Sequence, residues 1–155
     1  MKIFKKSIIT LILISIIGCD TDGTDSINYP EKIFEGNVIL KTQQEVDDFG
    51  TEHYTRITGY LEIGQIETYN GSITNINELS SLTSIDGFLR IQSLDLLDNI
   101  NGLSNITQIG AFIELVGNYS LINLDGLNSI TSVHGDLGIH YNTKLINLDG
   151  FDNIT

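Results

Sequence analysis

Residues 83–106 read TSIDGFLRIQSLDLLDNINGLSNI, residues 107–130 read TQIGAFIELVGNYSLINLDGLNSI, and residues 131–154 read TSVHGDLGIHYNTKLINLDGFDNI. These three stretches decide the fold, because each has 24 residues and no gap separates them. They share the pattern T-x-I-x-G-x-L-x-I, a turn, and then L-x-x-L-x-G-L-x-x-I. Self-similarity at a fixed period of about 20–50 residues indicates a stack of structural repeats.

Two further copies precede the clean ones. Residues 55–82 fit the pattern if four residues are inserted near positions 65–68, and a degenerate copy starts near Lys32. One copy cannot bury its apolar edge alone, but stacked copies can, at the parallel-strand spacing of about 4.8 Å. The sequence therefore predicts an all-β fold, a parallel solenoid of about five coils over residues 32–155.

The apolar residues within a copy change their spacing halfway along. Leu137 and Ile139 alternate with other residues, which is typical of a strand with one buried face. From Leu145 to Ile154 an apolar residue comes at every third position, which suits a chain that turns corners. No copy contains an amphipathic stretch long enough to predict a helix.

Polar residues recur at equivalent positions and are expected to form ladders along the stack. The three ladders are Thr55, Thr83, Thr107, Thr131 and Thr155; Asn75, Asn99, Asn123 and Asn147; and Asn77, Asn101, Asp125 and Asp149. Buried polar groups need hydrogen-bond partners, so we expect these side chains to satisfy backbone groups at the corners. This structural role is favoured over metal binding.

The pattern resembles the receptor L-domain, a leucine-rich-repeat-like right-handed β-helix of extracellular proteins. The matching stretches are ITGYLEI (57–63), IDGFLRI (85–91), VHGDLGI (133–139), the L-x-x-L-x-G-L-x-x-I runs at 121–130 and 145–154, and the opening GNVILKTQQEVDDFG (36–50). The resemblance implies a right-handed parallel β-helix. It implies no particular ligand, because the flanking disulfide cysteines of the receptor versions are absent. An ordinary leucine-rich-repeat horseshoe is the alternative, from LGIHYN (137–142).

The start of the chain reads MKIFKKSIITLILISIIGC (1–19). A basic start and a short apolar run are typical of a signal peptide and too short for a membrane span. The run ends in Ile17-Gly18-Cys19, which resembles a bacterial lipobox. The resemblance implies a signal peptide over residues 1–18, lipidation of Cys19, and a membrane-anchored extracytoplasmic protein, with the outer membrane or cell surface favoured. Residues 19–31 are expected to be an acidic tether.

Composition excludes several classes of function. The net charge is −12, and from Cys19 onward 5 Lys and Arg face 20 Asp and Glu, so nucleic acid is an unsuitable partner. The chain has one cysteine and three histidines, His53, His134 and His140, which makes a metal site improbable. No nucleotide-binding or hydrolase motif is present. We therefore expect neither catalysis nor a cofactor.

The outward positions of the predicted strands are the best candidate for a binding face. One outward position of successive copies holds the aromatic residues Tyr60, Phe88 and Phe112, and the next holds the charged residues Glu62, Arg90 and Glu114. An exposed aromatic column can mark a contact site for a protein or a glycan. The alternative is that the rings only stabilise the strands.

These observations together predict a lipid-anchored binding or adhesion module without catalysis. A structural envelope protein without a specific ligand is the first alternative, and a carbohydrate-active enzyme is the second. Solenoids need a polar cap over the last coil, and Ile154 has none before the sequence ends at Thr155. A truncated gene, a fragment and end-to-end self-association are the three readings of this feature.

Overall fold

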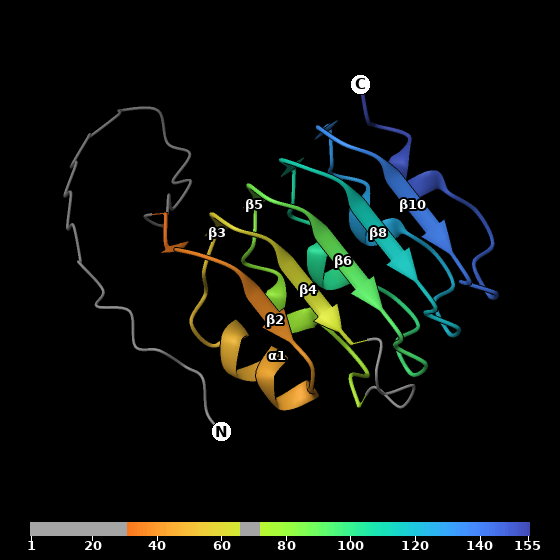
Figure 1. Cartoon of the computed structure of the whole chain (residues 1–155), viewed down its shortest axis with the longest axis horizontal. Helices are drawn as coiled ribbons and strands as arrows, with labels where there is room; N and C mark the ends of the chain where they lie inside the picture. Colours follow the sequence, from red (N-terminus) through yellow and green to blue (C-terminus); the bar gives the residue numbers. More distant parts are fainter. Residues whose placement is uncertain (1–30, 66–71) are drawn as a thin grey trace, which may run out of the picture.

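In a computed structural model, residues 31–65 and 72–155 are described, and they form two parallel five-stranded sheets (Figure 1). Strands of the two sheets alternate along the chain. The first sheet has two-residue strands: β1 (Ile33–Phe34), β3 (Arg56–Ile57), β5 (Ser84–Ile85), β7 (Gln108–Ile109) and β9 (Ser132–Val133). The second sheet has longer strands: β2 (Val38–Leu40), β4 (Leu61–Gly64), β6 (Leu89–Gln92), β8 (Ile113–Val116) and β10 (Leu137–His140).

The strand register follows the sequence repeat. Ile91 of β6 pairs with Leu115 of β8, which pairs with Ile139 of β10, so equivalent residues lie side by side. The same offset joins Ile85 to Ile109 in the first sheet. This confirms the parallel, strand-rich arrangement that the repeat predicts, and it is compatible with a parallel β-solenoid.

The predicted inward residues form one hydrophobic core between the sheets. In the copy at residues 107–130, every inward side chain is at most 1% exposed: Ile109, Ile113, Leu115, Leu121, Leu124, Leu127 and Ile130. The stretch with apolar residues at every third position turns its corner through a 3₁₀ helix. These short helices are η1 (Asn77–Leu79), η2 (Asn101–Leu103), η3 (Asp125–Leu127) and η4 (Asp149–Phe151).

Side chains of two of the three polar ladders bond to the backbone, as predicted. Thr83 Oγ1 donates to Thr55 O at 3.0 Å, and Thr107 Oγ1 donates to Thr83 O at 3.4 Å. The asparagine ladder receives the first N–H of each 3₁₀ helix, as where Asn101 N–H donates to Asn99 Oδ1 at 3.2 Å. Both ladders therefore satisfy backbone groups where the chain changes direction.

One helix differs from the sequence prediction. Residues of the degenerate first copy form α1 (Gln43–Gly50), where no helix was expected. Thr42 and Glu45 make a reciprocal capping box at its start, which satisfies two backbone N–H groups. Val46 and Phe49, three residues apart, then face the core. The helix lies at the β2 end of the second sheet (Figure 1).

The β10 end of the molecule has no such cover in the described chain. Leu137 and Leu148 are 44% and 53% exposed, although their equivalents one copy earlier, Ile113 and Leu124, are buried. The last copy therefore presents inward-type side chains to solvent.

The predicted signal peptide (1–18), Cys19 and all of the tether except Glu31 lie outside the described residues. Within residues 31–65 and 72–155, no helix combines the length and the apolar character needed to cross a membrane.

Candidate functional site

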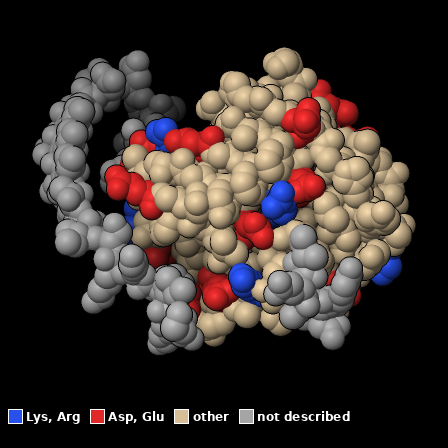
Figure 2. Space-filling view, viewed as in Figure 1, with Lys and Arg blue, Asp and Glu red and all other residues tan. Residues whose placement is uncertain are grey.

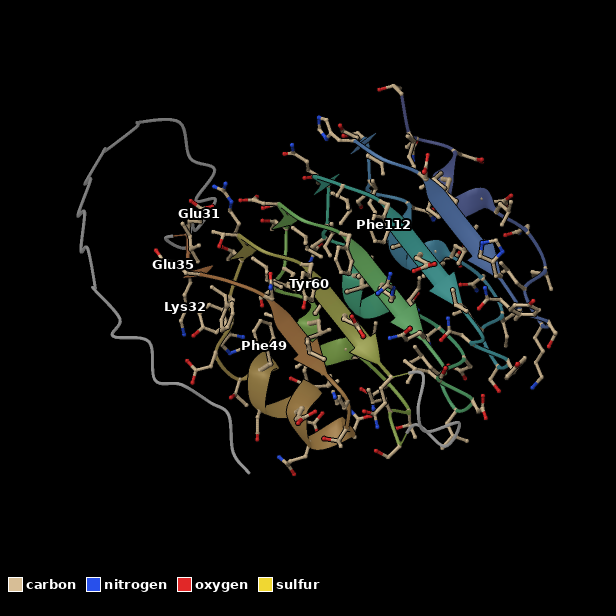
Figure 3. All side chains as sticks on the ribbon, in the orientation of Figure 1. Glu31, Lys32, Glu35, Phe49, Tyr60 and Phe112 are labelled. Atoms are coloured by element: carbon tan, nitrogen blue, oxygen red, sulfur yellow. The ribbon has the colours of Figure 1, made fainter. Side chains whose placement is uncertain are left out.

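The six residues predicted as a binding face lie together on the outer side of the second sheet. Strand pairing aligns β4, β6 and β8, and each of the three rings directly precedes one of these strands. Tyr60 and Phe112 project from this face toward the viewer in Figure 3. Figure 2 shows the same face as largely uncharged surface with isolated acidic and basic groups.

The three aromatic rings form a continuous stack. The ring centroids of Tyr60 and Phe88 are 4.3 Å apart with an interplanar angle of 8°, and those of Phe88 and Phe112 are 4.6 Å apart at 7°. Phe88 therefore has a ring against each of its faces. The column presents ring edges to solvent. Phe88 covers one face of the Phe112 ring, and the next repeat places no ring against the other face.

The charged column runs beside the rings. Arg90 Nε donates to Glu114 Oε2 at 2.6 Å, and Arg90 Nη1 lies 3.7 Å from Glu62 Oε2. Glu62 Oε1 also accepts a 2.6 Å hydrogen bond from Gln92 Nε2. The guanidinium carbon of Arg90 lies 5.1 Å from the ring centroid of Phe88 and 5.6 Å from that of Phe112. Rings and charges thus form one connected surface.

A depression of about 250 Å³ lies at the end of both columns. We call it the Phe112 pocket; its lining residues are Arg90, Phe112, Ile113, Glu114, Asp136 and Gly138. Register places Asp136 where the next ring would stand and Gly138 where the next charged side chain would stand. The pocket therefore results from two small residues in the last copy.

Sequence reasoning found the two columns but missed this pocket. The signal was present, because the first outward position changes from Phe112 to Asp136 and the second changes from Glu114 to Gly138. A change of residue type at a repeat position marks a place where the surface differs from its neighbours.

Other chemistry-bearing residues are dispersed. His53, His134 and His140 are all exposed and belong to different segments. In the described ranges, no three His, Cys, Asp or Glu side chains come together as a metal-binding group. In the first sheet, Arg56 Nη2 of β3 donates to Asp86 Oδ2 at 2.8 Å, and hydrogen bonding to Asp86 raises the pKa of the Arg56 guanidinium above its usual value.

Comparison of the chain with protein-family models, with curated proteins and with solved structures found no match.

Proposed function

We propose that this protein is a non-catalytic binding or adhesion module of the cell envelope, held to a membrane through lipid on Cys19. Its contact surface is the outer face of the second sheet. The observation that carries the proposal is the stacked column of Tyr60, Phe88 and Phe112, with the guanidinium carbon of Arg90 5.1 Å from the ring centroid of Phe88. Aromatic residues and arginine are the side chains most enriched among binding hot spots.

A protein partner suits this face better than a glycan. Sugars bind by laying a ring against an open aromatic face, and stacking at 4.3 and 4.6 Å covers both faces of Phe88, so the column offers a ring face only at its two ends. Ring edges and alternating charges, in contrast, match the mixed apolar and polar chemistry of a protein surface. Glycan binding is the outcome against which the protein partner is tested.

The fold that we propose is a right-handed parallel β-helix of about five coils, similar to the receptor L-domain. Two parallel sheets whose strands alternate along the chain support this over a leucine-rich-repeat horseshoe, which is built around one sheet. Parallel crossover connections are right-handed in nearly all proteins. A rod of stacked coils exposes a broad flat face, which suits a contact surface.

The function is tested with arrays of extracellular proteins and of glycans, probed with the full chain purified in detergent. We expect the chain to bind a protein probe, and the double variant Tyr60→Ser/Phe112→Ser to lose that binding while keeping its circular dichroism spectrum. Tyr141→Ser is the matched control, because Tyr141 is 73% exposed on the turn after β10 and outside the column.

Three results would contradict the proposal. Equal binding by the double variant and the unchanged protein would show that the aromatic face is not the contact surface. An array on which nothing binds would favour the structural envelope protein, and turnover of a glycan probe would favour the carbohydrate-active enzyme. The anchor is tested separately, since Cys19→Ser should move the protein out of the membrane fraction.

A further inference from the structure

The Phe112 pocket lies where two columns of side chains stop together. The ring column ends at Phe112, and the charge column of Glu62, Arg90 and Glu114 alternates in sign and ends on a carboxylate. The next members would be a ring and a cation. The last copy supplies Asp136 and Gly138 instead, so both are missing from the same place.

The charge balance of this place favours a cation. Glu62 and Glu114 share the single guanidinium of Arg90. Asp136 also lines the pocket, and its carboxylate makes no ion pair with any residue in the described part of the chain. The pocket lining therefore carries two carboxylates, those of Glu114 and Asp136, against the one guanidinium of Arg90, so its balance of charge is negative.

The shape of the pocket favours a flat group. Phe112 lines it, and Phe88 covers the opposite face of the Phe112 ring at 4.6 Å. A guanidinium is planar and cationic, stacks on aromatic faces, and binds carboxylates through two parallel hydrogen bonds. One step earlier, the guanidinium of Arg90 combines the same two kinds of neighbour, since its carbon lies 5.6 Å from the ring centroid of Phe112 and its Nε bonds to Glu114 at 2.6 Å.

We propose that the Phe112 pocket binds the guanidinium group of an arginine presented by a basic segment of a protein partner. The arginine stacks on Phe112 and pairs with Asp136 and Glu114, so that it continues both columns by one member. This inference rests on the proposed function, in which this face is the contact surface. It adds the chemistry of the group that the partner brings.

The direct test is an NMR titration of the full chain in detergent micelles with Nα-acetyl-arginine amide. We expect saturable shifts of the backbone amides of Phe112 and Gly138. Nα-acetyl-citrulline amide has nearly the same shape without the charge, and its affinity should be lower by a factor of about five or more. Equal shifts with the citrulline compound, or saturable binding of methyl glucoside in place of the arginine compound, would overturn the proposal.

Two variants test the pocket itself. A Cβ at Gly138 would meet its nearest atoms, Glu114 Cγ and His140 Nε2, at 3.6 Å, which is ordinary contact. Gly138→Arg should therefore fold. Its own side chain should place a cation in the pocket and so abolish binding of the arginine compound. Asp136→Asn should weaken it about fivefold without changing the fold. Gly138→Ala is the control that keeps the pocket open.

The outcomes separate the two proposals. If a protein probe found on the array still binds Asp136→Asn and Gly138→Arg but not Tyr60→Ser/Phe112→Ser, the contact surface stands and the arginine assignment is wrong. If that double variant binds as well, the proposed function itself is wrong. Loss of binding in all of these variants, with Gly138→Ala unaffected, supports both.

Discussion

Asn142 bonds across one repeat to Asn118, whose backbone N–H donates to Asn142 Oδ1 at 3.0 Å. Asn118 makes the same connection one repeat earlier, accepting from Leu94 N–H at 3.3 Å. Each side-chain amide also donates further back, that of Asn118 to Ile91 O at 3.0 Å and that of Asn142 to Leu115 O at 2.9 Å. These two side chains connect three successive turns that follow the strands of the second sheet.

Replacing Asn118 with Leu should therefore destabilise the fold severely. Asn118 is fully buried, and its loss leaves Leu94 N–H and Ile91 O without side-chain partners. We expect the free energy of unfolding to fall by about 2–4 kcal/mol, measured by urea denaturation. Asn105→Ala is the control, because the exposed Asn105 makes one side-chain hydrogen bond, to Ser80 O. A loss equal to that of the control would show that the buried ladder contributes nothing specific.

The middle ring of the aromatic column should contribute more to stability than an end ring. Phe88 stacks on two rings, whereas Tyr60 stacks on one ring of the column. Each stacked pair contributes about 0.5–1.5 kcal/mol beyond its buried area. Thermal unfolding of Phe88→Ala and Tyr60→Ala should show the larger loss for Phe88→Ala. The reverse order would mean that the stack is not an energetic unit.

A methyl group at Gly126 should disrupt the stack of repeats. A Cβ there would lie 2.0 Å from Ile100 O, in the backbone of the preceding repeat, and a Cβ at Gly102 would lie 1.8 Å from Ile76 O. Gly126→Ala must push two repeats apart, and we expect a loss of about 3 kcal/mol or more in urea denaturation. Gly138→Ala, on the open face, should change stability by less than about 1 kcal/mol. Similar values for both would argue against this close approach in solution.

The uncovered end should determine whether the chain associates with itself. Helix α1 covers the β2 end, so an end-to-end pair would form symmetrically between two β10 ends, where Leu137 and Leu148 are exposed. Sedimentation of the full chain in detergent should then show a dimer that Leu137→Asp converts to monomer. Glu35→Lys, exposed on the turn before β2, should leave the dimer intact. A monomer at all concentrations would contradict self-association.

Much of the fold could be predicted because each inward position recurs at a fixed spacing. Ile109 and Val133 needed only the repeat and the strand period to be placed side by side. Helix α1 could not be predicted in this way, because its two inward residues, Val46 and Phe49, also fit the degenerate repeat. The capping box at Thr42 decides in favour of the helix, and it is a local signal that the repeat pattern masks.

The turns after the strands of the second sheet needed information that the repeat does not contain. Ser93, Gly117 and Tyr141 have positive φ angles of 56°, 66° and 58° at the equivalent place of three successive copies. Glycine adopts this conformation freely, but Ser93 and Tyr141 do so against their preference. Residue type at this place therefore predicts the turn in only one of these three copies, the one with Gly117. The candidate binding face was easier to predict from the sequence, since outward positions follow directly from strand alternation.

The contrast between the two ends gives the molecule a direction in which it should open. Helix α1 closes one end with Val46 and Phe49, whereas β10 has a neighbour on one side in the described chain. In a stack where each repeat contacts mainly its neighbours, the outermost uncovered layer separates at the lowest free energy. Amide hydrogens of β10 should exchange with solvent first, those of β8 next, and those of β4 and β6 last. The fold would then unfold one repeat at a time, starting from the β10 end.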